Sequence, residues 1–263
     1  MNKVMVLYHA DADGFGAAYA LWKIYGPDAD YLPVQYSQPV PTIPPGIEEM
    51  FIVDFSYDRD TCQDLASRYK LTILDHHRTA AQALAGLPYA VFDMGKSGCR
   101  LSWEMVMGMH TPLPDILQYV EDYDLWRFTL PLSEAVNLAI ECMPRDFETW
   151  ESFNLIEATT SGLAIKRFRD RQIATTVKNV QLMTIDGHEN VPVVNTNLNV
   201  SEVGHALLDA YPAAPFASIY SCRGGVMVTS LRSRPGRVDV SAIAKKFGGG
   251  GHRHAAGFTM TAC

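Results

Sequence analysis

A histidine and two aspartates fall within five residues near the start of the chain, in the segment HADADG at residues 9–14. Carboxylates this close together repel one another, so the arrangement is costly unless a cation compensates it. Carboxylate oxygens beside an imidazole nitrogen suit a divalent transition metal. A second interpretation stays open, because Asp is a good helix N-cap and Gly a good turn residue, so the segment could simply begin a helix.

The elements around this segment follow an alternating pattern in the first half of the chain. Short apolar runs, typical of buried strands, alternate with stretches of helical periodicity. We expect strands at residues 4–8, 51–53, 71–74 and 89–92, and helices at residues 15–25, 59–69 and 100–107. This order predicts an α/β fold with a doubly wound, mostly parallel sheet that helices cover on both faces.

Residues able to bind a metal follow three of these strands. They are His9, Asp11 and Asp13 after the first strand, Asp54 at the end of FIVD, and Asp75, His76 and His77 at the end of LTILDHH. The carboxyl ends of parallel strands lie at one edge of the sheet, so these side chains are expected to meet in one crevice. Together with a fourth acidic cluster further along the chain, they suffice for two metal ions, with Asp54 available as a bridge.

A fourth acidic cluster ends a predicted helix further along, in the segment YVEDYDLW. It contains Glu121, Asp122 and Asp124, and could reach the same crevice.

The second half of the chain predicts a separate, smaller domain. Residues 147–183 are mostly helical, and one long amphipathic stretch there is suited to linking two domains. After it we expect a strand, a turn beginning at Asp186 and Gly187, a strand, a helix, two strands around a Gly224 and Gly225 turn, a helix and a glycine loop. We therefore predict a catalytic metal-binding domain at residues 1–145, a helical linker at 146–184 and a substrate-binding α/β domain at 185–263.

Charge is unevenly distributed along the 263 residues, whose formal net charge is −7. Residues 221–263 hold five Arg and two Lys against one acid, a net charge of +6, which leaves −13 for the rest. We expect the acidic part to bind cations and the basic part to bind anions.

Composition excludes several other classes of protein. The five cysteines are odd in number, scattered and without a Cys-x-x-Cys pair, which argues against a disulfide framework and a structural zinc site. We find no membrane span, and the opening MNKVMVLY is too short for a signal-peptide core, so we expect a cytoplasmic protein.

The same residues carry a resemblance to a known family. In order, HADAD, the strand-terminal Asp54, DHH and EDYD resemble the four motifs of the DHH phosphoesterase superfamily, which includes RecJ-like exonucleases, nanoRNases, cyclic-dinucleotide phosphodiesterases and family II pyrophosphatases. The tail LRSRPGRVDVSAIAKKFGGGGHRHAAGF resembles the associated C-terminal DHHA1 substrate domain. Several relatives space the first motif as His-x-x-x-Asp-x-Asp, whereas this chain has His-x-Asp-x-Asp, which leaves the role of Asp11 open.

The resemblance implies a ligand set for two metal ions. One ion would be held by His9, Asp11 and Asp54; the other would be held by Asp13, Asp54, His76 and either Asp122 or Asp124, which the sequence does not separate. Mixed carboxylate and imidazole ligation favours two Mn²⁺, with Mg²⁺ as the alternative. Catalytic roles would fall to Asp54, Asp75 and His77, with His77 contacting the phosphate or assisting the leaving oxygen.

The four consecutive glycines at residues 248–251 complete the predicted site. They could form a flexible hinge, but a helix and the segment HRHAAGF bound them, which favours a rigid loop whose amides face an anion. The expected substrate-binding residues are Arg100, Arg232, Gly249, Gly250, Gly251, His252 and Arg253. The acidic half would then cut a substrate that the basic half grips, in a cleft between the two domains.

These features lead to a Mn²⁺-dependent phosphodiesterase that hydrolyses short oligonucleotides or cyclic (di)nucleotides to nucleoside monophosphates. A net-acidic protein is poorly suited to long duplex DNA, and Phe247 and Phe258 could stack on a base or pack in the core. The alternatives are a phosphatase for nucleoside 3′,5′-bisphosphates, a single-strand exonuclease, and a nucleotide-binding sensor without activity. We expect no membrane partner, and a homodimer is left open.

Overall fold

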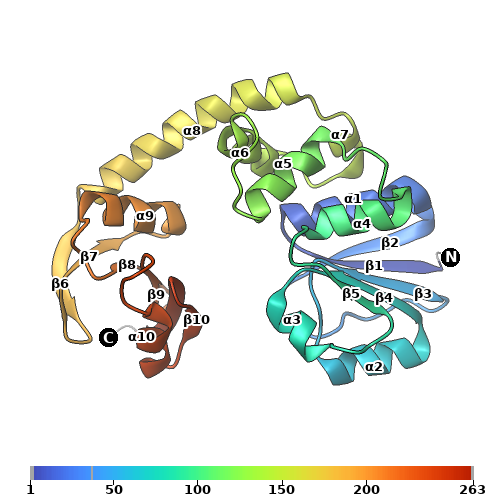
Figure 1. The fold of residues 1–263 in the computed structure, drawn as a ribbon, viewed down its shortest axis with the longest axis horizontal. Helices are drawn as coiled ribbons and strands as arrows, with labels where there is room; N and C mark the ends of the chain where they lie inside the picture. Colours follow the sequence, from blue (N-terminus) through green and yellow to red (C-terminus); the bar gives the residue numbers. More distant parts are fainter. Residues whose placement is uncertain (1–2, 37, 262–263) are drawn as a thin grey trace. The chain divides into compact units, whose positions relative to one another are not determined.

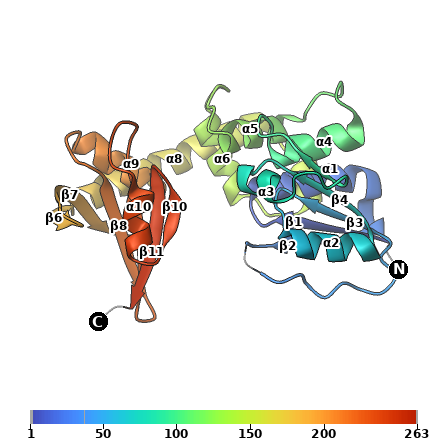
Figure 2. The same ribbon diagram turned by 60° about the horizontal axis from the view of Figure 1, so that its bottom comes forward.

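The chain forms two compact units, Met1–Lys166 and Arg167–Cys263, in a computed structural model that describes residues 3–36 and 38–261 (Figures 1 and 2). The division falls inside the long helix α8 (Leu155–Val177). The predicted limits of the catalytic domain, the linker and the substrate domain remain predictions. In the described part of the chain, no helix has both the length and the apolar composition that crossing a membrane requires.

A five-stranded parallel sheet forms the centre of the N-terminal unit. Its strands are β1 (Val4–His9), β2 (Ala29–Val34), β3 (Glu49–Val53), β4 (Lys70–Asp75) and β5 (Ala90–Phe92), in the order β2-β1-β3-β4-β5. Every neighbouring pair is parallel. The predicted doubly wound sheet is confirmed. The strand order reverses between β1 and β3, and ligands of such sheets bind outside the carboxyl ends of the strands at this point.

Helices cover both faces of this sheet, as Figure 1 shows. The face that receives Val6 is covered by α1 (Ala12–Tyr25), α4 (Gly98–Met107) and α5 (Asp115–Asp124). The face that receives Leu7 is covered by α2 (Arg59–Arg68) and by the segment around the short α3 (Arg78–Ala83). Successive strand residues point to opposite faces, so a continuous apolar strand such as β1 fills both cores.

Two further helices and the start of α8 complete the first core. They are α6 (Ser133–Cys142) and α7 (Phe147–Glu151). Trp150 of α7 is 1% exposed, and its ring lies 4.8 Å from the ring of Phe15. A short 3-10 helix, η1 (Gly26–Asp28), connects α1 to β2.

A six-stranded sheet forms the C-terminal unit, in the order β10-β11-β9-β8-β7-β6. The strands are β6 (Gln181–Ile185), β7 (His188–Asn195), β8 (Ala217–Arg223), β9 (Val226–Arg232), β10 (Gly250–His252) and β11 (Ala255–Thr261). β7 and β8 are parallel, and the other described pairs are antiparallel. With α9 (Val200–Ala210) and α10 (Val240–Lys246), this confirms a smaller C-terminal α/β part.

The glycine run differs from the predicted loop. The amides of Gly248 and Gly249 donate to the carbonyls of Lys245 and Ala244, so these two residues form the turn that follows α10. Gly250 and Gly251 belong to the edge strand β10, paired with β11. The run therefore combines a helix C-terminus, where Gly248 has a φ of 76°, with a strand, and two of its amides are already bonded. Phe247 and Phe258 stack on each other at 4.6 Å.

Candidate functional site

The first group of side chains that could hold a metal ion gathers at the ends of β1 and β3. Oδ2 of Asp11 lies 2.7 Å from Nδ1 of His9, and Oδ2 of Asp54 lies 3.6 Å from the same nitrogen. One ligand atom from each residue lies within 4.8 Å of the other two. Asp11 is also the N-cap of α1, since its Oδ1 accepts a hydrogen bond of 2.9 Å from the Gly14 amide. The helix-cap interpretation of HADADG is therefore confirmed, while metal binding by the same segment remains a prediction.

The second group combines Asp13, His76 and Asp124, again with ligand atoms within 4.8 Å. Nε2 of His76 lies 3.6 Å from Oδ2 of Asp13 and 3.6 Å from Oδ2 of Asp124. Asp13 belongs to the first turn of α1, His76 follows β4, and Asp124 ends α5. Three elements far apart in the sequence thus converge at the predicted edge of the sheet.

Asp54 lies between the two groups. Its Oδ1 is 3.1 Å from Nε2 of His76, while its Oδ2 faces His9. The residue is 1% exposed and has a left-handed backbone, with φ at 63°. Gly98 makes room for it, because a Cβ on Gly98 would lie 2.5 Å from the Asp54 Cβ. Asp54 belongs to the group with His9 and Asp11 and also to a third group with His76 and His77, whose ligand atoms lie within 4.8 Å of one another. A buried acid with a left-handed backbone that two such groups share is typical of a functional position.

Asp75 holds the two histidines that follow β4. It is fully buried, and its Oδ1 accepts hydrogen bonds from the His76 amide, the His77 amide and the His77 ring at Nδ1, the last at 2.7 Å. Its Oδ2 accepts a bond of 2.6 Å from the Ser56 hydroxyl. Nε2 of His77 lies 3.1 Å from the Tyr36 hydroxyl. Asp75, His77 and Tyr36 therefore form a hydrogen-bonded chain at the border of the site.

The electrostatics show that the site concentrates negative charge. Burial, and then the charge of Asp13, raise the pKa of Asp54 well above its usual range, and the same two causes raise the pKa of Asp124 to about 7. The contacts of His9 with Asp11 and then Asp54 raise its pKa to about 10. Burial opposes ionisation of Asp75, yet His77 and Ser56 lower its pKa overall. A bound cation would relieve this repulsion.

Comparison with known families accounts for this arrangement. Residues 3–124 match the model of the DHH family, N-terminal domain, a stretch that begins at β1 and ends on Asp124. This part of the chain is therefore similar to the N-terminal domain of the DHH family. The resemblance predicted from the sequence is thereby confirmed for the DHH domain.

Relatives align with nearly the whole chain. The oligoribonuclease NrnB of Bacillus subtilis (strain 168) is 24% identical, over 96% of this chain and 72% of that protein. The pGpG-specific phosphodiesterase PggH from Vibrio cholerae has a structure that covers 99% of this chain and 94% of its own, with 15% identity and a TM-score of 0.63. RecJ from Thermus thermophilus in complex with Mn²⁺ covers 98% of this chain and 49% of its own, with 14% identity and a TM-score of 0.59. The two structures show a shared fold.

The fourth motif of the DHH domain divides into two positions with different surroundings. Asp124 lies with Asp13 and His76, whereas the Asp122 carboxylate accepts hydrogen bonds from the Thr129 amide, the Thr129 hydroxyl and the Leu130 amide. Among the described residues, the structure therefore groups Asp124 and not Asp122 with the other side chains that could hold a metal ion.

Asp13 and Arg100 are fixed by α4 and α5. The carboxylate of Asp13 accepts hydrogen bonds from the Gly98 and Cys99 amides at the start of α4, at 2.6 and 2.9 Å. Arg100 does not stand free for a substrate, because its Nε lies 2.6 Å from both carboxylate oxygens of the buried Glu121. Its predicted role in substrate binding stays untested.

Three residues beside the DHH site were not predicted from the sequence. Tyr36 follows β2, a strand that was not predicted, and contacts His77. Ser56 donates a hydrogen bond to Asp75, and Gly98 leaves the space that the Asp54 side chain fills. Ser56 comes two residues after Asp54, so the segment DFS offered a signal for it. Tyr36 and Gly98 offered none, because their roles depend on how distant segments pack.

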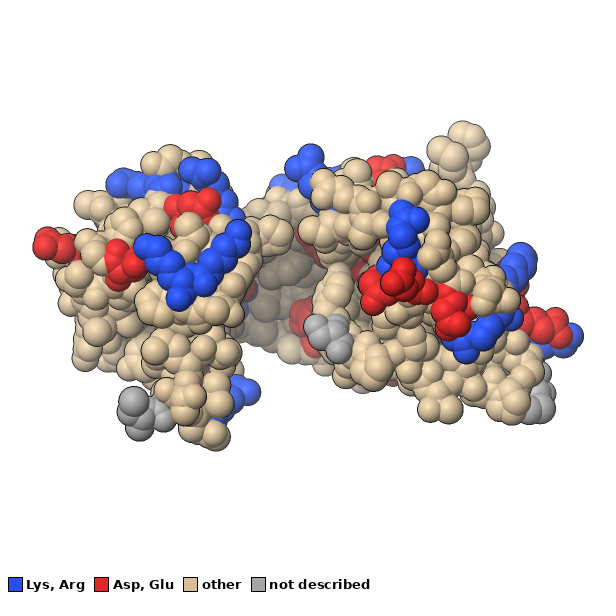
Figure 3. Space-filling view, turned by 90° about the horizontal axis from the view of Figure 1, so that it is seen from below, with Lys and Arg blue, Asp and Glu red and all other residues tan. Residues whose placement is uncertain are grey.

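The predicted anion-binding residues lie near one another in the C-terminal unit. Ala255 of β11 pairs with Arg232 of β9 on one side and His252 of β10 on the other, so these three side chains share a face of the sheet. Arg232 is partly buried, and its Nη2 donates to the Ser201 hydroxyl at 2.9 Å. Arg253 is exposed and lies 4.0 Å from Asp239. On the face seen in Figure 3, Lys and Arg side chains gather on this unit.

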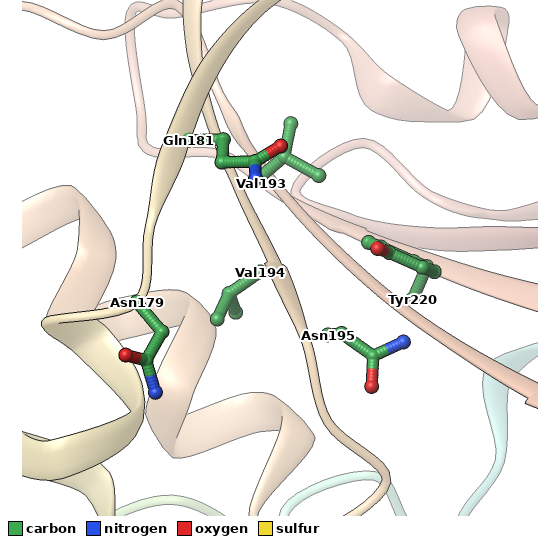
Figure 4. Close-up of a pocket in the computed structure, with 6 residues that line it drawn as sticks. All are labelled: Asn179, Gln181, Val193, Val194, Asn195 and Tyr220. Atoms are coloured by element: carbon green, nitrogen blue, oxygen red, sulfur yellow. The ribbon is translucent and has the colours of Figure 1, made fainter.

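A cavity of about 250 Å³ lies elsewhere in the C-terminal unit (Figure 4). Its lining contains neither an acidic nor a basic side chain: Asn179, Gln181, Val193, Val194, Asn195 and Tyr220. It is therefore distinct from the predicted anion-binding residues.

Proposed function

We propose that this chain is a Mn²⁺-dependent phosphodiesterase that hydrolyses short oligonucleotides to nucleoside monophosphates. The match of residues 3–124 to the DHH family, together with relatives named an oligoribonuclease and a phosphodiesterase, supports a phosphoesterase. The observation that carries the finer proposal is the position of Asp54, which lies within 3.6 Å of His9 on one side and of His76 on the other. Two ligand groups that share one buried carboxylate are the arrangement a two-ion site requires.

The side chains present fit metal ions by their own chemistry. Nδ1 of His9 is buried and makes no aligned hydrogen bond with any described residue, although Oδ2 of Asp11 lies 2.7 Å away, so this nitrogen is available to ligate an ion. One ion would be held by His9, Asp11 and Asp54, and the other by Asp13, Asp54, His76 and Asp124. Imidazole together with carboxylate favours Mn²⁺ over Mg²⁺, which prefers oxygen ligands and retains water.

The protein's own groups would orient the phosphate and manage the proton of the leaving oxygen. Ions of this class, when bound, lower the pKa of water and stabilise negative charge on a transferring phosphoryl group. Asp75 accepts the Nδ1–H of His77 and so fixes the ring, while the Tyr36 hydroxyl lies 3.1 Å from Nε2 and 3.3 Å from Nδ1. When Nε2 also carries a proton, His77 can donate a hydrogen bond to a phosphate oxygen or pass that proton to the leaving group.

The substrate class rests on charge and on the relatives. NrnB is named an oligoribonuclease, and PggH a pGpG-specific phosphodiesterase, so both relatives are named for short substrates. A net charge of −7 disfavours long duplex DNA, whose binding depends on many phosphate contacts. The basic residues of the C-terminal unit, Arg232, His252 and Arg253, would bind a further phosphate of a short strand.

A product assay tests this proposal. Purified protein, stripped with chelator and supplied with Mn²⁺, is incubated with a panel comprising the dinucleotide pApA, longer single strands, cyclic di-AMP, a nucleoside 3′,5′-bisphosphate and pyrophosphate, and products are identified by mass spectrometry. We expect AMP from pApA at the highest kcat/KM. Release of phosphate from the bisphosphate alone would favour the phosphatase instead, and hydrolysis of none would favour a sensor.

A single-strand exonuclease is the second candidate, supported by the fold likeness to RecJ at a TM-score of 0.59. It would prefer strands of many nucleotides, whereas our proposal predicts that kcat/KM falls as the strand lengthens beyond a few nucleotides. The same assay on strands of increasing length decides between them.

A further inference from the structure

Two large aromatic side chains are exposed directly after the fourth DHH motif. Trp126 is 58% exposed and Phe128 is 39% exposed, and their rings lie 4.7 Å apart in an edge-to-face contact. The partly buried ring of Tyr123 lies 5.8 Å from Trp126 and 5.6 Å from Phe128. We call residues 126–128 the aromatic loop. Large exposed rings grouped in this way are typical of surfaces that bind a partner.

The backbone of the aromatic loop is strained to present these rings. Trp126 and Phe128 both have left-handed backbones, with φ at 55° and 50°, a conformation that bulky residues rarely adopt. Such strain persists only where the surrounding structure holds it. Asp122 supplies this support, because its carbonyl accepts the Arg127 amide at 2.9 Å and its carboxylate accepts the Thr129 amide at 2.9 Å.

The aromatic loop is connected to two segments that carry residues of the DHH site. Trp126 follows Asp124 by two residues, and Asp124 lies with Asp13 and His76. Nη2 of Arg127 donates at 2.6 Å to the carbonyl of Gly95, in the segment that leads into α4, where the Gly98 amide bonds Asp13. The loop therefore begins two residues after a predicted metal ligand and is bonded to the segment that leads into α4, within one compact unit.

We propose that the aromatic loop is a stacking platform for one nucleobase of the substrate, next to the phosphate that is cut, with Trp126 as its main surface. The inference rests on the proposed function, because it takes the substrate to be a nucleotide. An indole face stacks on any base and does not discriminate between bases, so the platform would bind unpaired strands without sequence specificity. A second protein chain is the other occupant that exposed rings could take, and it becomes an outcome of the test.

The test compares substrates with and without bases. For wild-type protein and Trp126→Ala, kcat/KM is measured with Mn²⁺ on pApA and on two analogues that lack either the 5′ or the 3′ base. We expect wild type to have a higher kcat/KM for pApA than for one of the analogues. In the variant the ratio of these two kcat/KM values should fall by about 5- to 150-fold, the range for one base–aromatic stack. Trp126→Phe should restore most of it. Phe168→Ala, which removes an exposed ring from α8, should leave the preference unchanged.

Other outcomes overturn the inference. An equal loss on pApA and on both analogues would show that Trp126 supports the fold or the metal site. An unchanged preference, together with a change from dimer to monomer in sedimentation velocity, would assign the loop to a protein contact.

A fluorescence titration separates this inference from the proposed function. Trp126 is the most exposed of the four tryptophans, so a stacked base should quench it, and pApA should quench wild type but not Trp126→Phe. If wild type hydrolyses no substrate yet shows this quenching, the proposed function fails and the stacking platform stands. Absence of quenching by pApA at concentrations that saturate hydrolysis would contradict the platform.

Discussion

Nε2 of His76 lies 3.1 Å from Oδ1 of Asp54, although the two residues follow different strands. This contact joins two ligand groups into one site, because the other oxygen of Asp54 faces His9 at 3.6 Å.

Asp54→Asn should abolish catalysis without unfolding the protein. Asn has nearly the same size and tolerates the left-handed backbone at this position, so the fold should persist. Burial and Asp13 already disfavour the charge of Asp54, so the metal-free variant should be at least as stable as wild type. We expect kcat to fall by several orders of magnitude and Mn²⁺ binding to weaken at both ions. Thermal melts, Mn²⁺ titrations and turnover of pApA measure this, with the exposed Asp60→Asn as control; near-normal turnover would remove Asp54 from the site.

Asp122→Ala and Asp124→Ala should have opposite effects. Loss of Asp122 leaves the Thr129 and Leu130 donors without their acceptor, so the free energy of unfolding should fall by about 1–3 kcal/mol. Loss of Asp124 removes a carboxylate that burial and Asp13 disfavour, so stability should not fall, whereas Mn²⁺ affinity should. Denaturant titrations and calorimetric Mn²⁺ titrations on both variants distinguish the two roles. A greater loss of Mn²⁺ affinity in Asp122→Ala than in Asp124→Ala would reverse the assignment.

Mn²⁺ affinity should rise between pH 6 and pH 8. The pKa of Asp124 is raised to about 7 in the metal-free protein, so at pH 6 the ion must displace a proton that is mostly absent at pH 8. The pKa of His9 is about 10, so its proton is released on binding at both pH values. Calorimetry in buffers of different ionisation enthalpy counts these protons. Fewer protons should be released at pH 8 than at pH 6, and Asp124→Asn should reduce this difference; an affinity independent of pH would contradict the account.

Tyr36→Phe should lower turnover while leaving metal binding intact. The hydroxyl of Tyr36 contacts His77 at 3.1 Å, and losing a partner that orients a functional histidine costs about 10- to 100-fold in activity. The effect should appear in kcat, because His77 would act on the reacting phosphate. Tyr57→Phe is the matched control, since its buried hydroxyl has no hydrogen-bond partner among the described residues. Equal effects of the two substitutions would exclude a specific role for Tyr36.

Gly98→Ala should damage the site through sterics alone. The new Cβ would lie 2.5 Å from the Cβ of Asp54 and 2.8 Å from its Oδ1, so Asp54 would have to move. We expect weaker Mn²⁺ binding and lower turnover with secondary structure preserved in circular dichroism. Gly95→Ala, in the same segment, is the control, because its Cβ would meet only the Asp93 side chain at 3.2 Å. Full activity of Gly98→Ala would show that this edge of the site is loosely packed.

The central strands were predictable because apolar side chains fill them on both faces. β1, β3 and β4 are largely apolar runs, which indicates strands buried in a parallel sheet. Because parallel strands place their carboxyl ends at one edge, the sequence alone predicts that His9, Asp54 and His76 lie together there. β2 was missed because it is an edge strand, half exposed and interrupted by Pro33.

Other parts of the site depend on packing that spacing alone does not encode. Asp122 and Asp124 lie at the end of the same helix. The loop that follows α5 donates hydrogen bonds to Asp122, which leaves Asp124 to group with Asp13 and His76. The glycine run was expected as one loop. Instead, Gly249 bonds the carbonyl of Ala244 in the turn after α10, and Gly250 pairs with Gly257 in an edge strand. Residue types indicated the chemistry of these segments, and their neighbours in space determined how it is used.

Hydrolysis of pApA in ¹⁸O-labelled water, with and without Mn²⁺, tests the central claim most directly. In Mn²⁺, mass spectrometry should detect two AMP per pApA, with one ¹⁸O atom in the phosphate of one of them, and chelator-stripped protein should yield none. Undiminished hydrolysis in chelator, or AMP without label in its phosphate, would contradict attack of water at phosphorus in a metal-dependent site.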